Sequence, residues 1–473
     1  MTIEKSQLNK RWRIRTGERQ VILLLGDLLC GYLAVFLGLY FWGQKDWLDF
    51  SWEFLGQRAP FWFFVLPLLW IILLIEIYDI RKANHKKDVL RGIATAAGFS
   101  FVIYLVIFFV SGPNSLPRRG VFIFILAATF STLFWRLLYI SIFTAPVFTR
   151  RALIIGAGKA GSTLAEMLRD IQPGPFQLIG FVDDDEEKQN MEINGYQVLG
   201  TGPMLTQLIE EHDVTDLIFA ISGELNHDLF RSILKVAETD IEVTSMPTLY
   251  EEVFGRVPIF LLQSDWILRS FLDQTHTSGA YESIKRLLDI LGSLMGLALL
   301  LVLYPFIAIA ILIESGSPVL YSQMRVGKFG QPYKIFKFRS MFQDAEKDGV
   351  QKTATVGDER ITRVGKILRR SHIDELPQCW NILKGENSII GPRAEQIDLA
   401  EKFQKELPFY RARLFVRPGL TGWAQVNQRY ASTVGDTAVK LEYDLYYIKN
   451  RNLLLDLMII FKTIGTVLGL KGL

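Results

Sequence analysis

Two adjacent carboxylates stand in residues 371–378, which read Ser-His-Ile-Asp-Glu-Leu-Pro-Gln. Asp374 and Glu375 have cations on both sides of them in the chain. These cations are Arg360, Arg363, Lys366, Arg369, Arg370 and Arg393. Guanidinium groups hold phosphate oxygens in pairs, and a carboxylate that binds a hard cation leaves its neighbour free to attack phosphorus. The pattern predicts a metal-assisted site for a diphosphate, although an Asp-Glu helix start in a surface ion-pair network would look the same locally.

This carboxylate motif belongs to a longer series of short motifs in a fixed order. They occupy residues 285–290, 318–327, 337–341, 374–378, 391–393 and 417–422. In this order they resemble the signature of bacterial polyprenyl-phosphate sugar-1-phosphate transferases, the initiating enzymes of exopolysaccharide, capsule and O-antigen assembly. Several unrelated motifs in the right sequence make a chance match improbable.

The resemblance implies transfer of a sugar 1-phosphate from a uridine diphosphate sugar (UDP-sugar) to undecaprenyl phosphate, with release of UMP. It implies that the Asp374 carboxylate attacks the phosphorus next to the sugar and forms an acyl phosphate, which the lipid phosphate then displaces. Glu375 would hold Mg²⁺, which neutralises the diphosphate. The residues expected to bind phosphate are Lys337, Arg339, Arg369 and Arg393.

Two departures from the family pattern bear on this site. Ala394 follows the Gly-Pro-Arg turn at residues 391–393, where the family has a second proline, so the loop that aims Arg393 could be looser. His372 and Cys379 stand where small polar and apolar residues are expected. None of these changes removes a reacting group, so activity is still expected.

The N-terminal part predicts a membrane domain, because hydrophobic residues make up 50% of the chain. Four apolar runs of spanning length predict a four-helix transmembrane domain over residues 1–148. The runs are 21–42, 61–80, about 92–111 and 120–143. The distribution of Lys and Arg puts the N-terminus inside, which predicts the bacterial inner (cytoplasmic) membrane with the soluble parts on the cytoplasmic face. Asp27 and Arg136 are interpreted as helix-packing contacts, and the net charge of +3 gives no reason to expect nucleic acid.

Residues 149–274 predict a Rossmann-like α/β domain. Gly156, Gly158 and Gly161 follow a buried strand and open a helix, and Asp183 follows a second strand. This spacing is what a nicotinamide dinucleotide (NAD) or another nucleotide would need. The alternative is that the glycines only permit tight strand-to-helix packing in a regulatory or dimerising module. Both interpretations stay open, and the packing interpretation is favoured.

The C-terminal part, residues 280–473, is the expected catalytic domain. Its first segment, residues 285–313, is apolar and long enough to cross a membrane, but both of its flanks are basic. Pro305 interrupts the run, and a proline kinks a helix. We therefore predict a re-entrant helix that enters and leaves on the cytoplasmic face, as the resembling family has, with a kinked fifth span as the alternative. Residues 452–470 suit an interfacial helix.

The predicted fold class is a membrane protein of α plus α/β type with a monotopic α/β catalytic domain. Its expected partners are a UDP-sugar, undecaprenyl phosphate and the membrane. A homodimer is also predicted. One rival function is a membrane-anchored NAD-dependent nucleotide-sugar dehydratase or epimerase, which leaves Asp374, Glu375 and Pro305 without a purpose. A second rival is a non-enzymatic scaffold for polysaccharide assembly proteins. Loss of the phosphate-handling residues would then have no effect.

Overall fold

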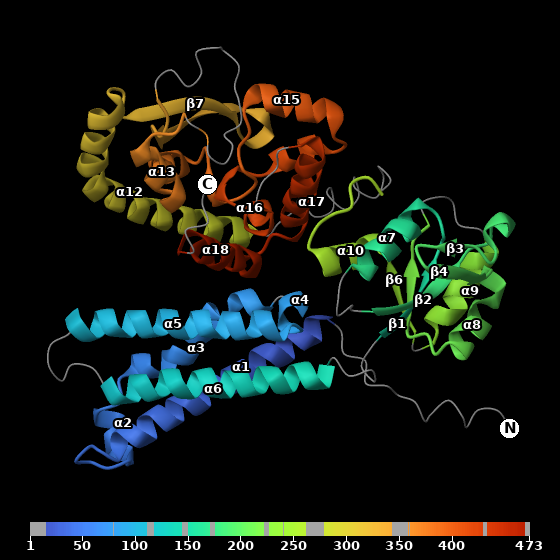
Figure 1. Ribbon diagram of the computed structural model, residues 1–473, viewed down its shortest axis with the longest axis horizontal. Helices are drawn as coiled ribbons and strands as arrows, with labels where there is room; N and C mark the ends of the chain where they lie inside the picture. Colours follow the sequence, from blue (N-terminus) through green and yellow to red (C-terminus); the bar gives the residue numbers. More distant parts are fainter. Residues whose placement is uncertain are drawn as a thin grey trace. The chain divides into compact units, whose positions relative to one another are not determined.

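The structure is a computed structural model, and it divides into two compact units, residues 1–246 and 247–473. The residues that it describes are 16–78, 80–110, 118–143, 150–170, 176–221, 227–239, 241–261, 279–342, 358, 360–428 and 433–468. The first unit contains an all-helical part and an α/β part. The second unit contains the carboxylate motif (Figure 1).

Three long apolar helices dominate the N-terminal part. They are α1 (Thr16–Gly43), α5 (Lys86–Val110) and α6 (Arg118–Phe143). Helix α6 packs against both α1 and α5 (Figure 1). These three and α12 (Gly279–Ser315) are long and apolar enough to cross a membrane, by length and composition. The expectation of a membrane protein is thus supported.

The expected span at residues 61–80 is not one continuous helix. It consists of η1 (Phe61–Val65), α3 (Leu66–Leu73) and η2 (Ile75–Tyr78). The regular backbone hydrogen bonds of α3 end at Leu74. After the break, the guanidinium of Arg136 donates to the carbonyl of Ile77 over 2.9 Å. A broken helix leaves backbone carbonyls that need partners in an apolar environment, and a neighbouring side chain supplies one here. Sequence periodicity gives no warning of such a break.

A buried ion pair joins α1 to α6. Arg136 donates to the two Asp27 oxygens over 2.6 and 3.3 Å, and neither side chain is exposed. The Tyr78 hydroxyl also donates to Asp27 over 2.7 Å. The interpretation of these two charges as helix-packing contacts is confirmed.

The α/β part is a six-stranded sheet in the order β3-β4-β2-β1-β5-β6. Its strands are β1 (Arg150–Ile155), β2 (Phe176–Val182), β3 (Glu192–Ile193), β4 (Tyr196–Gly200), β5 (Asp216–Phe219) and β6 (Glu242–Ser245). All pairs are parallel except β3 with β4. The helices that connect them are α7 (Lys159–Arg169), α8 (Leu205–Glu211) and α9 (His227–Ala237) (Figure 1). The expected Rossmann-like architecture is present, with β1 central because the chain returns from β4 to the other side of it.

The second unit begins earlier than the expected catalytic domain. Val257 and Ile259 are buried in the same hydrophobic core as Leu441 and Leu445. Trp423 donates its indole N–H to the Gly255 carbonyl over 2.7 Å. The chain therefore divides at residues 246 and 247 rather than at residue 274.

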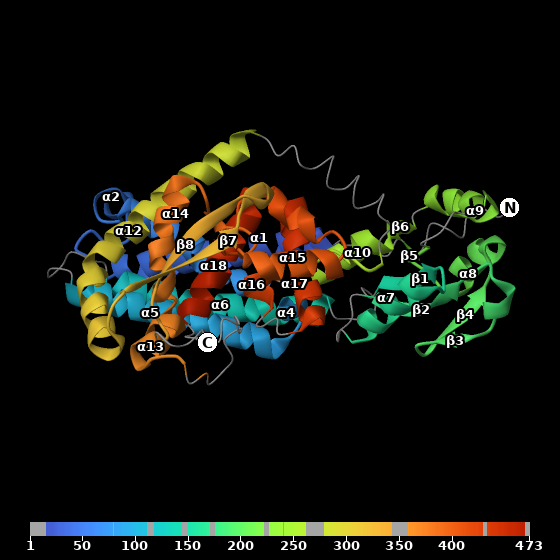
Figure 2. The same cartoon turned by 90° about the horizontal axis from the view of Figure 1, so that it is seen from above.

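The second unit contains α17 (Val434–Asn450) and several shorter elements. They are α10 (Met246–Phe254), the hairpin of β7 (Leu320–Val326) and β8 (Pro332–Phe338), the two-stranded sheet of β9 (Ser388–Ile390) and β10 (Gly419–Thr421), α14 (Cys379–Lys384), α15 (Ile397–Glu406), α16 (Trp423–Asn427) and α18 (Leu453–Leu468). Figure 2 shows the β7–β8 hairpin as a long ribbon within this unit.

Helix α12 is bent, and its first turns are bound to the second unit. Its ribbon changes direction between its two ends in both views (Figure 1, Figure 2). Pro305 lies inside this helix, where a proline removes a backbone hydrogen bond. Near its start, Arg286 donates to the carbonyls of Ile382 and Leu383, each over 2.7 Å, at the C-terminal end of α14. The start of α12 is thus bound to the rest of the second unit.

The last turn of α12 is bound to the same unit. Glu314 accepts from the backbone N–H groups of Arg363 and Val364 over 2.6 and 2.8 Å. Arg339 donates to the carbonyl of Ser315 over 2.9 Å and also to the carbonyl of Gly316. Both ends of an apolar 37-residue helix are therefore held by one folded unit.

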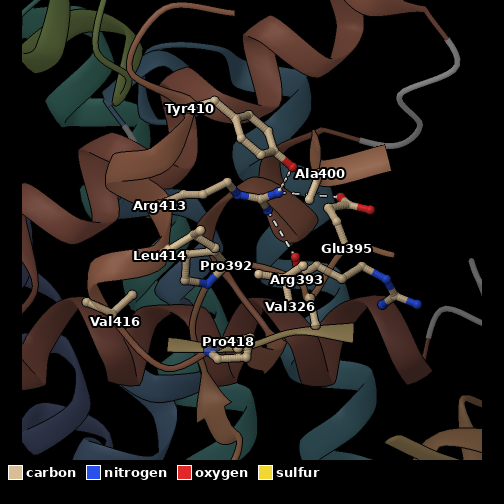
Figure 3. A pocket seen from close by; sticks show the side chains of 12 residues that line it. Val326, Pro392, Arg393, Glu395, Ala400, Tyr410, Arg413, Leu414, Val416 and Pro418 are labelled. Atoms are coloured by element: carbon tan, nitrogen blue, oxygen red, sulfur yellow. Dashed lines mark hydrogen bonds and ion pairs between the residues drawn. The ribbon is translucent and has the colours of Figure 1, made fainter. Parts of the chain in front are cut away.

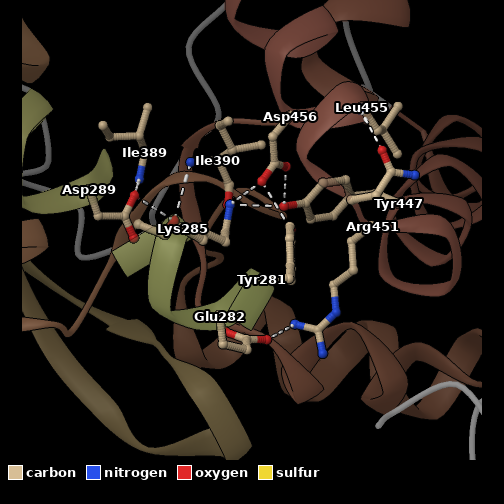
Figure 4. A network of polar contacts seen from close by, with 12 residues as sticks. Tyr281, Glu282, Lys285, Asp289, Ile389, Ile390, Tyr447, Arg451, Leu455 and Asp456 are labelled. Atoms are coloured by element: carbon tan, nitrogen blue, oxygen red, sulfur yellow. Dashed lines mark hydrogen bonds and ion pairs between the residues drawn. The ribbon is translucent and has the colours of Figure 1, made fainter. Parts of the chain in front are cut away.

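Helix α18 is amphipathic, as expected for residues 452–470. Its buried Asp456 accepts from Tyr281 and Tyr447, each over 2.9 Å, and from Lys285 over 3.0 Å (Figure 4). Leu454, on the other face, is 67% exposed. Asp456 is thus a buried charge that binds α18 to the first turns of α12.

Glu442 on α17 gives a pH-dependent stability. It is buried, accepts from the Tyr250 hydroxyl over 3.2 Å and lies 3.5 Å from Arg256. Burial raises its pKa to about 7, with Arg256 opposing. Between the ordinary glutamate pKa of 4.5 and about pH 7 the folded state holds a proton that the unfolded state has lost. The stability that this bound proton contributes is fully present below pH 4.5 and is lost as the pH rises through about 7. The loss in the free energy of unfolding is at most about 3 kcal/mol.

We therefore expect the thermal stability of wild type to fall, relative to that of Glu442→Gln, between pH 5 and pH 8, because glutamine stays neutral. Thermal unfolding of the full chain in detergent at both pH values measures this. Glu401→Gln, on an exposed position of α15, is the control and should track wild type. An equal difference between wild type and Glu442→Gln at both pH values would contradict the prediction.

Candidate active site

The carboxylate pair follows a short cationic helix. Helix α13 (Arg363–Ser371) begins at Thr362, whose hydroxyl accepts from the Gly365 N–H over 2.8 Å. It ends at His372, whose φ of 57° is left-handed. Histidine is among the residues that enter this region more often than most. The reversal leads into the 3-10 helix η7 (Ile373–Gln378) and buries both carboxylates, Asp374 at 8% and Glu375 at 7% exposure.

Glu375 is held by two cations from different parts of the unit. Lys337 on β8 donates to its Oε1 over 2.6 Å. Arg393, in the loop after β9, donates to the same oxygen over 2.8 Å. Charge-assisted hydrogen bonds of this kind are about twice as strong as neutral ones. Lys337 lies 38 positions before Glu375 in the sequence and Arg393 lies 18 positions after it, yet both meet at one of its oxygens.

The surroundings push the pKa values of the two carboxyls in opposite directions. Burial alone would raise the pKa of Glu375, but Arg393 and Lys337 lower it well below the usual range. Burial and the charge of Glu375 raise the pKa of Asp374 to about 6. Within the part of the chain that the structure describes, no side chain donates a hydrogen bond to Asp374. Glu375 is therefore the fixed anion of the pair, and Asp374 is the more basic carboxylate with its oxygens still available.

Arg369 lies near the pair, whereas Arg339 does not bond to it. Arg369 donates from Nε to the Ser340 hydroxyl over 2.8 Å, and its charge opposes the rise in the pKa of Asp374. Arg339 instead holds the C-terminal end of α12 at Ser315 and Gly316. Of the four cations expected to bind phosphate, the structure thus gathers Lys337, Arg369 and Arg393 around the carboxylates and gives Arg339 a structural contact.

A small pocket opens beside Glu375. Its lining contains residues that the sequence did not single out as site residues, among them Arg325, Gln378 and Leu420. A second pocket lies behind the Gly-Pro-Arg loop and is lined by Val326, Pro392, Glu395, Tyr410, Arg413, Val416 and Pro418, among others (Figure 3). Arg325 lies in a motif that the sequence already marked. Arg413 carried no signal, because nothing local distinguishes a buried arginine from a solvated one.

The carboxylates fit a magnesium ion only if the substrate supplies further ligands. Among the described residues no group of three or more His, Cys, Asp or Glu side chains could hold a metal. Mg²⁺ in nucleotide sites is commonly bound by one or two carboxylates together with substrate phosphates and waters. Asp374 and Glu375 offer that donor set, although Lys337 and Arg393 already hold one oxygen of Glu375.

The glycine motif of the α/β part is largely explained by packing. Gly156 has a φ of +103°, and a Cβ at Gly161 would lie 2.0 Å from the Gly156 carbonyl oxygen. Asp183 accepts from the N–H of Ala157 over 2.7 Å with one oxygen and from the N–H of Asp185 over 3.0 Å with the other. At Gly158 a Cβ would meet nothing within 4 Å. Of these three glycines, Gly158 alone lacks a packing reason.

These features define a class of protein that has apolar helices long enough to cross a membrane and a buried carboxylate pair set against lysine and arginine. The family models agree. Residues 280–470 match the family described as bacterial sugar transferase, and residues 73–247 match the one described as CoA-binding domain.

Curated relatives extend the match over most of the chain. A UDP-glucose:undecaprenyl-phosphate glucose-1-phosphate transferase of Escherichia coli (strain K12) is 38% identical over 67% of each chain. A UDP-N-acetylgalactosamine-undecaprenyl-phosphate N-acetylgalactosaminephosphotransferase of Aeromonas hydrophila is 44% identical over 50% of this chain and 55% of its own. An undecaprenyl-phosphate glucose phosphotransferase of Komagataeibacter xylinus is 29% identical over 94% of this chain and 83% of its own. The chain belongs to the bacterial sugar transferase family.

Replacing Lys337 should weaken the binding of a diphosphate, whereas replacing Arg339 should not. Lys337→Met removes one of two cations at Glu375, so we expect the affinity for pyrophosphate with Mg²⁺ to fall about tenfold to a hundredfold. Arg339→Met is the matched control, because it removes a cation that holds the end of α12. It should lower thermal stability and leave the affinity within about twofold. Isothermal titration of the detergent-solubilised protein measures both, and equal losses of affinity would contradict the assignment.

Proposed function

We propose that the protein transfers a sugar 1-phosphate from a UDP-sugar to undecaprenyl phosphate and releases UMP. The product is undecaprenyl-diphosphate-sugar, the first membrane intermediate of exopolysaccharide, capsule or O-antigen synthesis. The observation that carries this proposal is the buried Asp374–Glu375 pair, with Lys337 and Arg393 fixed on Glu375. The names of the relatives support the same donor and acceptor classes.

In the proposed first step an oxygen of Asp374 attacks the phosphorus that bears the sugar. The bond between that phosphorus and the bridging oxygen of the diphosphate breaks, and UMP leaves with the electron pair. Asp374 then carries the sugar phosphate as an acyl phosphate. An oxygen of undecaprenyl phosphate attacks the same phosphorus in the second step and releases the Asp374 carboxylate. The more basic carboxyl of the pair is thus the nucleophile, and burial shields the intermediate from water.

The cations divide the negative charge of the substrate among them. Arg369 and Arg393 are positioned to bind phosphoryl oxygens bidentately, and Lys337 adds a third positive charge. Mg²⁺, held by Glu375 together with the diphosphate, would neutralise the leaving UMP.

The anchoring of α12 supports the re-entrant topology. A straight helix of 37 residues is about 55 Å long, which exceeds the thickness of the bilayer's apolar core. Its first turns bind α14 through Arg286, and its last turn binds α13 through Glu314. Both contacts belong to one folded unit, so α12 enters and leaves the membrane on the same face. We place that face in the cytoplasm, where nucleotide sugars are made, in the bacterial inner membrane.

The nicotinamide-dependent dehydratase or epimerase is not favoured. Both oxygens of Asp183, the residue expected to hold the ribose, accept backbone N–H groups within the α/β part. The curated relatives are named as phosphotransferases and transferases. A Rossmann-like domain that regulates or assembles the enzyme accounts for these observations without redox chemistry.

The topology is tested by cysteine accessibility. In a background without Cys30 and Cys379, we expect Ser283→Cys and Ser317→Cys, which flank the apolar part of α12, to behave alike. Both should resist a membrane-impermeant maleimide in intact spheroplasts and react after lysis. Gln57→Cys lies within residues 45–58, between the first two apolar runs, where the mixed charge predicts an outside position. It is the positive control and should react before lysis. Reaction of only one of the two α12 positions in intact spheroplasts would mean that α12 crosses the membrane.

The reaction is tested by release of UMP from a panel of UDP-sugars with undecaprenyl phosphate and Mg²⁺. Asp374→Asn should lose about a thousandfold or more of the rate, because the amide is no nucleophile. Without the lipid, wild type should gain the mass of one sugar phosphate on a peptide containing Asp374, and Asp374→Asn should not. If Asp374→Asn releases UMP at the wild-type rate, the covalent mechanism is wrong. If wild type releases no UMP from any donor, the proposed function is wrong.

A further inference from the structure

The loop that carries Arg393 is fixed by bonds to its backbone. Four of its carbonyl oxygens each accept a hydrogen bond, and the donors come from three separate parts of the unit. The Pro392 oxygen accepts from the Gly419 N–H over 2.9 Å, the Arg393 oxygen from Arg413 over 3.0 Å, the Ala394 oxygen from Arg325 over 3.2 Å, and the Glu395 oxygen from the Val326 N–H over 3.0 Å. Two of these four donors are arginine side chains. The chain thus uses two arginine side chains, of which Arg413 is buried, to hold a short piece of backbone.

Arg413 is the more deeply placed of the two arginines. It lies in η8 (Tyr410–Phe415) and is 4% exposed. One terminal nitrogen donates to the Tyr410 hydroxyl over 2.8 Å, and the other donates to Asp444 over 2.8 Å as well as to the Arg393 carbonyl. Figure 3 shows Arg413 reaching the backbone of Arg393 while the Arg393 side chain extends away from it. A single rigid guanidinium therefore joins α17, its own helix and the loop.

The charges around Arg413 balance. Glu395 bonds Lys440 and lies 3.7 Å from Arg413, and Asp444 pairs with Arg413 over 2.8 Å. Burial alone would raise the pKa of Glu395, but Lys440 and Arg413 lower it to about 2, so it is ionised. Arg413 and Lys440 thus face Asp444 and Glu395, and of these four side chains Arg413 and Asp444 are buried. Burying such a set is costly, and apolar residues of similar volume often stabilise a fold as well or better. Stability alone does not explain the set, whereas a fixed loop does.

We propose that Arg413 is a positioning residue, which holds the backbone of residues 391–395 so that the Arg393 guanidinium stays at Glu375 and meets the diphosphate of the sugar nucleotide. The inference rests on the proposed function for the identity of that diphosphate. It also accounts for Ala394, where the family has a second proline. A loop whose carbonyls are bound by Arg413 and Arg325 does not depend on a proline ring for its shape.

The alternative is that Arg413 only neutralises Asp444 in the core. Arg413→Lys separates the two roles, because a lysine keeps the positive charge beside Asp444 but cannot present the planar fork that reaches several acceptors at once. Lys449→Met is the matched control. It breaks another buried ion pair on α17, that of Lys449 with Glu251 at 2.7 Å, which does not touch the loop.

The first readout is hydrogen exchange of the full detergent-solubilised chain without substrate. In Arg413→Lys we expect faster deuterium uptake in a peptide that spans residues 389–397 and unchanged uptake in peptides from α6. Lys449→Met should lower thermal stability and leave uptake at residues 389–397 unchanged. If Arg413→Lys leaves that uptake at the wild-type level, the inference fails. This readout needs no turnover, so it decides the role of Arg413 even if the proposed function is wrong.

The second readout is a double-mutant cycle on UMP release, with wild type and Asp374→Asn in the same assay to establish the reaction itself. Arg413→Lys should lower kcat/KM about tenfold in the wild-type background and less than about twofold in an Arg393→Ala background, because both changes remove one interaction. Effects that multiply in full would show that Arg413 does not act through Arg393. They would overturn the inference while leaving the transferase reaction in place.

Discussion

The contact on which the rest of the second unit depends is the pairing of Glu375 with Lys337 and Arg393. A buried carboxylate stays ionised at low cost only when it is paired, and here two cations from separate elements meet one oxygen. Because the two partners are committed to Glu375, neighbouring Asp374 stays unpaired among the described side chains and becomes the more basic carboxyl. Two residues adjacent in sequence thus acquire different chemistry from their surroundings.

The same cationic site is built onto the apolar helix α12. Glu314 at its end accepts the first N–H groups of α13, which leads through His372 into Asp374. Asp289, nearer its start, accepts from the N–H of Ile389 over 2.9 Å, just before the Gly-Pro-Arg loop. Both the carboxylate pair and Arg393 are therefore connected through short paths to the apolar helix α12. This suits the proposed reaction, in which a water-soluble donor meets a lipid acceptor.

The α/β part illustrates how one motif supports two interpretations. The glycines at positions 156 and 161 are required by a left-handed turn and by a close backbone approach, and Asp183 closes the loop on itself. The spacing alone indicates a nucleotide site, since the same turn geometry serves both purposes.

The broken helix of the N-terminal part is a second case, because apolar length alone predicted a span at residues 61–80. Arg136 bonds the carbonyl of Ile77 where that helix is interrupted, a contact between segments far apart in the chain.

The sequence by itself predicted the order of the parts, the long apolar helices, the first two strands of the sheet, and the two carboxylates with most of the cations that lie near them. These features depend on local composition, periodicity and ordered short motifs. Only the tertiary structure decided that Arg339 holds the end of α12, that residues 247–261 belong to the second unit, and that Arg413 binds the loop of Arg393. The physical reason is that a hydrogen bond between residues distant in the chain leaves no local pattern. Lysine and arginine look alike in sequence whether they face water, a carbonyl or a carboxylate.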